Sequence, residues 1–457
     1  MRPVNQADAR CGRAPRTIEA PPNTPRRLVV PAAPETLAHA ADLAAFVEAS
    51  PSSFHAAAEV AARLESAGFT RLDEAAAWPA PAGGRFLVVR DGAVLAWVVP
   101  PSATASTGVR IFGAHSDSPA FKLKPKPTTG KLGWLQAGVE IYGGPLLNSW
   151  LDRELRLAGR LVLDDGSTAL AATGPLLRLP QLAIHLDRDV NSGLALDKQS
   201  QTQPVWGLGA SDSADILGEL AREAGVDAAR IRGYDIVTAD AARGATFGLD
   251  DVFFASGRLD DLASVHAGVV ALERAADGFD ADHIAMLAVF DHEEVGSGTR
   301  SGAAGPFLSD VLERLWLSLG ADREQQLRAL AASWCVSSDV GHSVHPNYAD
   351  KHDPVVQPML GSGPILKINA NQRYATDAAG AAAWNTWCAE AGVHSQEFVS
   401  NNGVPCGSTI GPITATRLGI RTVDVGIPIL SMHSARELAG VSDLWDLARV
   451  AEVFFRG

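Results

Sequence analysis

Hydrophobic and polar positions form two different patterns along this chain of 457 residues. In residues 36–120 and 249–457, short unbroken apolar runs alternate with segments whose apolar residues recur at i, i+3 and i+4. The first pattern predicts strands buried on both faces, and the second predicts amphipathic helices. Strands that alternate with helices are typical of an α/β fold with a parallel or mixed sheet.

The individual elements follow from these runs and from the turn and capping residues between them. Asp91-Gly92 lies between two apolar runs and predicts a hairpin, and Pro51-Ser52-Ser53 predicts the start of a helix that ends near Ala67. We expect the other helices at residues 36–49, 259–276, 306–319, 323–332, 378–391, 409–418 and 444–455. We expect strands at residues 85–90, 93–99, 109–114, 284–290, 334–337, 365–368, 394–399 and 421–425.

In the middle of the chain, residues 121–248, the apolar runs are shorter and turn residues are more frequent. Short apolar runs such as Val139–Tyr142, Leu155–Leu163 and Ala183–Leu186 alternate with Gly, Pro and Asp-Gly turns. Helical periodicity is scarce there until Ser211–Gly225. This pattern predicts a β-rich insertion that interrupts the α/β unit.

Composition and charge narrow the classes of function. The chain is 46% hydrophobic with a net charge of −13, which excludes wholesale disorder and argues against nucleic acid or an anionic membrane as the main partner. No apolar run approaches the roughly 20 residues that span a bilayer. The four cysteines have no close spacing, which favours a reduced cytoplasm, and the high Ala and Arg content suggests a bacterial source. Residues 1–35 are rich in Arg, Pro and Ala without a period and predict a flexible extension.

Polar groups of the metal-ligand type follow several predicted strands. His115-Ser116-Asp117, Asp291-His292-Glu293-Glu294 and Asp339 each follow an apolar run, and His433 follows the apolar segment 423–430. Asp260 and Asp261 open a helix. In open α/β sheets, ligands gather beyond the carboxyl ends of the strands. Two imidazoles and three carboxylates converging there would suit zinc, with one carboxylate shared between two ions.

Each of these groups also has an ordinary structural interpretation. Glu293-Glu294 could be a solvated surface pair, and Asp260-Asp261 could be acids that favour a helix N-terminus. His115 could be a hydrogen-bonded residue without a ligand. If His115 binds a metal ion, Asp117, two residues on, could orient its ring. No Walker A sequence or complete dinucleotide fingerprint is present. The spread of ligand-type residues over five segment ends is what favours a metal site.

Longer motifs carry a resemblance to a known family. They are Ser50–His55, Gly113–Pro119, Ser149–Leu155, Ala183–Leu186, Asp291–Ser297, Asp339–Lys351, Gln372–Ala375, Cys406–Pro412 and Met432–Ser434. With these motifs the chain resembles the M18 metallo-aminopeptidases, the aspartyl aminopeptidase family, from about Leu43 to its C-terminus. Ser116 stands where the family usually has Thr, and Asp261 and His292 stand where Asn is common.

The resemblance implies roles for individual residues. One zinc would be held by His115, Asp260 and Asp339, and a second by Asp260, Glu294 and His433, so that Asp260 bridges. Glu293 would be the general base, because it is adjacent to the ligand Glu294 and can reach a metal-bound water. Lys367 and His342 would contact substrate, Lys367 by reading an acidic side chain, and His185 would reach into the active site of a neighbouring subunit.

The resemblance also implies an overall architecture and an activity. The fold would be an α/β zinc-peptidase-type catalytic domain, residues 36–120 and 249–457, with a mixed sheet flanked by helices. A β-rich dimerisation domain, residues 121–248, would interrupt it, and dimers would build a tetrahedral dodecamer. The expected function is a cytoplasmic dinuclear zinc aminopeptidase, with Mn²⁺ or Co²⁺ as possible substitutes, acting on peptides with a free N-terminal Asp or Glu. A neutral, Leu-like specificity, a carboxypeptidase-like deacylase and a non-catalytic oligomeric shell are the alternatives.

Overall fold

The computed structural model describes residues 33–79 and 83–457. The predicted flexible extension therefore lies outside the described residues, except for residues 33–35. The first helix, α1 (Pro34–Ala49), begins two residues earlier than predicted, with a proline in its first turn. Among the described residues, no helix is both long and apolar enough to cross a bilayer.

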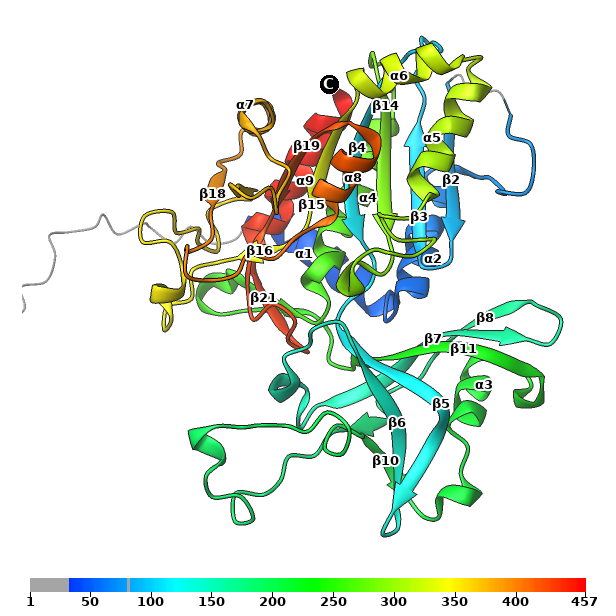
Figure 1. Ribbon diagram of the computed structural model, residues 1–457, viewed down its shortest axis with the longest axis vertical. Helices are drawn as coiled ribbons and strands as arrows, with labels where there is room; N and C mark the ends of the chain where they lie inside the picture. The colour runs from blue at the N-terminus through cyan, green and yellow to red at the C-terminus, as the bar shows by residue number, and fades with distance from the viewer. Residues whose placement is uncertain (1–32, 80–82) are drawn as a thin grey trace, which may run out of the picture.

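The α/β part of the chain, which we call the upper unit, lies at the top of Figure 1. A nine-stranded mixed sheet forms its centre. Its strands, in spatial order, are β1 (Thr70–Arg71), β2 (Arg85–Arg90), β3 (Ala93–Val98), β14 (Ile284–Phe290), β4 (Val109–His115), β15 (Trp334–Ser338), β19 (Arg421–Gly426), β17 (Ile365–Lys367) and β18 (Gln396–Phe398). The central strands β14, β4, β15 and β19 run parallel, whereas β3 and β17 are antiparallel to their inner neighbours. All seven residues of β14 are buried, as its unbroken apolar run predicts.

Helices cover both faces of this sheet. One face packs against α1, α2 (Ser53–Ser66), α4 (Leu259–Ala276), α7 (Ala378–Ala391) and α9 (Val441–Arg456). The other packs against α5 (Phe307–Ser318), α6 (Arg323–Ala332) and α8 (Ile410–Leu418). The predicted α/β fold, with a mixed sheet flanked by helices, is confirmed.

The register of the parallel strands gathers the candidate ligands at one edge. Phe290 pairs with His115, and Ser337 pairs with Gly113, so β14, β4 and β15 end side by side. The residues that follow each strand therefore emerge next to one another. A smaller sheet lies against this edge, in the order β12 (Ala245–Phe247), β13 (Phe253–Ser256), β21 (Glu437–Gly440), β20 (Pro428–Leu430) and β16 (Gly341–His342).

The β-rich unit, at the bottom of Figure 1, lies between β4 and β14 in sequence. Its strands are β5 (Ala120–Lys131), β6 (Trp134–Tyr142), β7 (Glu154–Leu163), β8 (Thr168–Ala172), β9 (Leu177–Arg178), β10 (Val205–Leu208) and β11 (Ile231–Asp240). Because β11 pairs with both β5 and β7, the pairings close on themselves, and α3 (Ile216–Ala224) contributes Ile216 and Leu220 to the core.

One predicted apolar run of this unit is not a strand. Ala183–Leu186 lies in a loop of turns, and Leu182, Ile184 and Leu186 are exposed. Apolarity alone cannot separate a strand that is buried in its own core from a segment that leaves its side chains outside. The long strand β5 was not predicted, because Lys and Pro interrupt its apolar residues.

Candidate metal centre

His115 stands at the last position of β4, with its ring buried. Its Nε2 lies 3.2 Å from Asp260 Oδ1 and 3.8 Å from Asp339 Oδ1. Its Nδ1 lies 3.1 Å from the backbone carbonyl oxygen of Asp117. A proton on Nδ1 donated to that carbonyl leaves the lone pair of Nε2 directed at the two carboxylates, which is the tautomer a metal ligand needs.

His433 forms a second group on the other side of Asp260. Its Nε2 lies 3.3 Å from Asp260 Oδ2 and 3.4 Å from Glu294 Oε2. Its Nδ1 lies 3.0 Å from the carbonyl oxygen of Gly144, in the segment that follows β6. The β-rich unit therefore orients the ring of this candidate ligand, again with Nε2 turned toward the carboxylates.

Asp260 belongs to both groups, because its two oxygens face different imidazoles. In each set of three or more candidate ligands, the ligand atoms lie within 4.8 Å of one another. Within residues 33–79 and 83–457, the buried oxygens Asp260 Oδ1 and Glu294 Oε1 have no hydrogen-bond partner. Unpaired anionic oxygens are costly to bury, and divalent cations would satisfy them. Two nitrogens among carboxylate oxygens is a donor set that fits zinc.

The charges of these groups perturb one another strongly. Burial raises the pKa of Glu294 well above its usual range, with a further contribution from Asp260. Burial alone would lower the pKa of His433, but its contact with Asp260 raises the pKa to about 9. The carboxylates therefore attract positive charge to this position, a proton in the absence of a metal ion.

Glu293 lies next to a ligand of each group, His115 and Glu294. One ligand-type atom of Glu293 lies within 4.8 Å of those of His115 and Glu294. Burial raises the pKa of Glu293 to about 7. A half-buried carboxylate next to the centre and with such a pKa can accept a proton near neutral pH.

Asp117 supports this region more extensively than the sequence indicated. Its carboxylate accepts the backbone N–H of Glu293 at 3.0 Å and that of Glu294 at 3.1 Å. It also accepts the hydroxyl of Tyr142 at 2.8 Å. Its Oδ1 is 3.5 Å from His115 Nδ1, farther than its own carbonyl oxygen. Asp117 thus fixes the turn that carries Glu293 and Glu294 as well as the ring of His115.

Two buried carboxylates of the site were not predicted as functional residues. Asp261 joins the first group and accepts the backbone N–H of His115 at 3.2 Å, and the peptide bond that precedes it is cis. Glu437 accepts the backbone N–H groups of both Asp260 and His433. Because Asp261 directly follows the predicted ligand Asp260, the sequence did indicate that it lies near the metal centre. A single Glu at the start of a short strand offered no comparable signal.

Lys367 and His342, two of the three predicted substrate residues, lie close to the candidate metal centre. Lys367 is buried, with its Nζ 2.8 Å from the carbonyl oxygen of Val340 and 3.7 Å from Asp339 Oδ2. His342 lines an adjacent cavity of about 260 Å³ together with Tyr374 and Lys351. Lys367 therefore lies next to the candidate centre, and His342 is near enough for the charges of Asp260 and Asp339 to act on its pKa, which burial lowers.

His185 is not brought to the centre within this chain. It lies in the exposed loop between β9 and β10, and its side chain makes no hydrogen bond or ion pair with the described residues. The side chains of Leu182, Ile184 and Leu186 around it are exposed by 56%, 51% and 74%. A subunit considered alone leaves this apolar segment without a covering partner.

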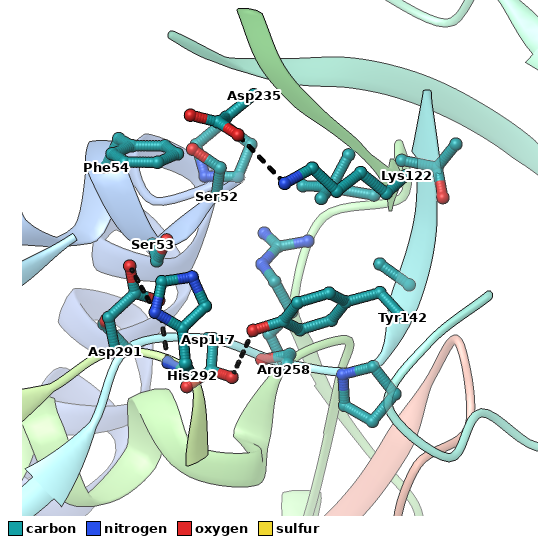
Figure 2. Close-up of a pocket in the computed structure, with 18 of the residues that line it drawn as sticks. Ser52, Ser53, Phe54, Asp117, Lys122, Tyr142, Asp235, Arg258, Asp291 and His292 are labelled. Carbon is teal, nitrogen blue, oxygen red and sulfur yellow. Dashed lines mark hydrogen bonds and ion pairs between the residues drawn. The ribbon is translucent and has the colours of Figure 1, made fainter. Parts of the chain in front are cut away.

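A cavity of about 220 Å³ lies behind the centre, between the two units (Figure 2). It is lined by residues of the upper unit, including Asp291 and Arg258, and by Lys122 and Tyr142 of the β-rich unit. Among the lining residues, the hydroxyl of Tyr142 donates to Asp117, and Lys122 pairs with Asp235 at 2.9 Å. Residues that support the centre therefore come from both units.

Comparison with known proteins gives a consistent result. A profile of the family described as aminopeptidase I zinc metalloprotease (M18) matches residues 46–455. The probable M18 family aminopeptidase 2 of Streptomyces coelicolor is 53% identical over 422 residues, which cover 92% of this chain and 98% of that protein.

Two solved structures contain chains that are also similar to this chain over most of its length. A cryo-EM structure of the Ape4 and Nbr1 complex contains a chain of 34% identity and TM-score 0.88, with 92% of this chain and 86% of that chain covered. The mApe1 dodecamer of S. cerevisiae has 28% identity and TM-score 0.80, with 91% and 96% covered.

Proposed function

The chain belongs to the M18 family of zinc metallo-aminopeptidases, and from this premise we propose that it removes N-terminal Asp and Glu from peptides at a dinuclear zinc centre. The observation that carries the proposal is the shared position of Asp260, whose two oxygens face His115 and His433 at 3.2 and 3.3 Å. One carboxylate between two imidazoles, each with a further carboxylate, is the arrangement that two ions with one bridging ligand require.

The ligands divide between the two positions. His115, Asp260 and Asp339 would hold one zinc, and Asp260, Glu294 and His433 the other, with Mn²⁺ or Co²⁺ as substitutes. Bound divalent ions supply Lewis acidity, which polarises the scissile carbonyl and makes water nucleophilic near neutral pH.

Glu293 moves the proton in this proposal. Its carboxylate takes the proton from the attacking water and then delivers it to the leaving amine. Asp117 keeps Glu293 in place by accepting its backbone N–H at 3.0 Å. Burial raises the pKa of Glu293 to about 7, and positive charge held by the neighbouring ligands would favour its basic form at neutral pH.

The preference for acidic residues rests on Lys367 and His342. The charge of Lys367 lies beside Asp339, and the acidic protein as a whole repels an acidic substrate. A local cation is therefore needed to attract the side chain of N-terminal Asp or Glu. Because Lys367 is buried and also contacts Asp339, a neutral, Leu-like specificity is the second candidate function.

Assembly is the remaining part of the proposal. The β-rich unit, residues 121–248, would form dimers, and dimers would build a tetrahedral dodecamer, as the dodecameric S. cerevisiae mApe1 supports. The exposed apolar residues around His185 support insertion of this loop into the active site of a neighbouring subunit. The free thiols of Cys335, Cys388 and Cys406 are compatible with the cytoplasm, which we propose as its location.

A single panel tests the proposed function. Zinc content is measured by mass spectrometry, and hydrolysis of Asp-, Glu- and Leu-anilides is followed with and without chelator. We expect two zinc ions per chain and chelator-sensitive hydrolysis that is fastest on Asp or Glu. Faster hydrolysis of the Leu substrate would overturn the acidic preference, and metal-replete protein that hydrolyses none of the three would overturn the aminopeptidase.

A further inference from the structure

Glu437 joins the two loops that carry Asp260 and His433. Its Oε2 accepts the backbone N–H of Asp260 at 3.0 Å, and its Oε1 accepts that of His433 at 2.7 Å. The residue is only 2% exposed, and it belongs to none of the ligand groups. Both of its oxygens are therefore occupied by the backbone of candidate ligands.

The sheet explains why Glu437 occupies this position. Ser256, at the end of β13, pairs with Glu437, at the start of β21. Asp260 lies a few residues after Ser256, and His433 lies a few residues before Glu437, so the pairing sets the two loops side by side. A Cβ on Gly257 would lie 2.8 Å from the carbonyl oxygen of Ala435, which shows how closely the loops approach.

The backbone of His433 needs such support. Its φ of +64° is in the left-handed region, which costs a non-glycine residue about 1 kcal/mol or more. Glu437 accepts its N–H, and its carbonyl oxygen accepts the N–H of Leu146 at 2.9 Å. A carboxylate at position 437 can accept the N–H groups of both Asp260 and His433, because both of its oxygens are acceptors. An amide of the same shape would turn its N–H₂ group toward one of these two donors.

We propose that Glu437 is a positioning residue of the metal centre, which fixes the spacing between Asp260 and His433 and thereby sets the zinc affinity of the position formed by Asp260, Glu294 and His433. The inference rests on the proposed function only in taking that position to hold zinc. Groups that orient metal ligands typically change metal affinity by about 10- to 100-fold when they are substituted.

The test measures zinc binding itself. The full chain carrying Glu437→Gln is titrated with Zn²⁺ against a competing chelator, and the visible absorption of the Co²⁺-loaded protein is recorded. We expect the zinc-binding step that uses both His433 and Asp260 to weaken by about 10- to 100-fold, and the step that shares only Asp260 to weaken less, with an altered Co²⁺ spectrum. Wild-type affinities in Glu437→Gln, an equal weakening of both steps, or a wild-type chain that binds one zinc ion would each overturn the inference.

Asp443 provides a matched control. This fully buried carboxylate also accepts two backbone N–H groups, those of Gly361 and Gly363 at 2.7 and 2.8 Å, and it lies beyond the other end of β21. Asp443→Asn should lower the melting temperature and leave both zinc affinities unchanged. An equal change in zinc affinity in this variant would mean that Glu437 acts through general stability, which would overturn its positioning role.

A second variant covers the case in which Glu437→Gln does not fold. Glu437→Asp keeps the charge but is one methylene shorter, so it reaches only one of the two N–H groups. The same zinc-binding step should weaken, and wild-type affinities in Glu437→Asp would overturn the inference. If the wild-type protein shows no peptidase activity, the proposed function fails, whereas the zinc titrations still decide the role of Glu437.

Discussion

Replacing Lys367 by Met tests whether a buried cation reads the substrate side chain. Met keeps the length of the side chain and removes its charge, which lies 3.7 Å from Asp339 Oδ2. Two unit charges at about 4 Å interact by about 4 kcal/mol at an effective dielectric constant of about 20. If an acidic substrate side chain approaches Lys367 as closely, about 4 kcal/mol of discrimination is at stake, equivalent to about three powers of ten in kcat/KM.

The expected result is a difference between substrates. The side chain of N-terminal Asp loses a partner and that of Leu does not, so Lys367→Met should lower kcat/KM for the Asp-anilide at least ~10²-fold more than for the Leu-anilide. Zinc content should be retained, because removing a positive charge near Asp339 strengthens the attraction of its carboxylate for cations. Steady-state kinetics and zinc analysis on the same preparation make both measurements.

Lys351 offers a control for this experiment. It lines the same cavity as His342, its side chain is 65% exposed, and it lies 3.4 Å from Asp350. An exposed ion pair contributes little, so Lys351→Met should leave the preference for Asp over Leu unchanged. An equal loss on both substrates in Lys367→Met, or a lost preference in Lys351→Met, would refute Lys367 as the residue that reads the side chain.

The remaining predictions concern the base, the assembly and acid stability. Glu293→Gln should lower turnover at least ~10²-fold with zinc retained, whereas Glu294→Gln should lose zinc; fast turnover by zinc-replete Glu293→Gln protein would remove the base assignment. Mixed particles of inactive His185→Phe and Glu293→Gln subunits should regain activity, and confirmed mixed oligomers without activity would contradict a shared site. Burial, aided by His266, lowers the pKa of His39 from 6.5 to about 3. Below pH 6.5 the unfolded chain binds a proton that the folded chain does not, so the free energy of unfolding should fall as the pH falls toward 3. Denaturant unfolding should show a shallower fall in His39→Gln, and an equal fall would exclude His39 as a cause.

Much of the main sheet could be predicted because its strands are buried on both faces. The runs at β14 and β4 are apolar without interruption, and their ends are marked by polar residues. Strands whose pattern is broken were missed: β5 contains Pro125 and Pro127, and β13, β20 and β21 are only three or four residues long. The pairing of β13 with β21 joins segments that are distant in sequence, which no local period records.

The candidate ligands could be identified because each follows a strand or opens a helix, where the fold gathers polar groups. Of the supporting carboxylates, Asp117 was predicted, whereas Asp261 and Glu437 were not assigned a role. Asp261 and Glu437 act on the backbone N–H groups of residues that are often far away in sequence, as in the contact from His115 to Asp261. The segment around His185 differs in another way: its apolar run predicted a strand, and the side chains of Leu182, Ile184 and Leu186 are exposed in a loop. The role of His185 in a neighbouring subunit stays a prediction.

The two sheets contribute different halves of the centre. Parallel register in the nine-stranded sheet brings His115 and Asp339 together, whereas the pairing of β13 with β21 in the smaller sheet brings Asp260 beside His433. Asp260 faces both halves, so the spacing between the two ligand groups depends on how the smaller sheet lies against the edge of the larger one. A substitution at that junction can therefore change one metal position without touching any ligand, which is why Glu437 is a sharper probe of the centre than another ligand variant would be.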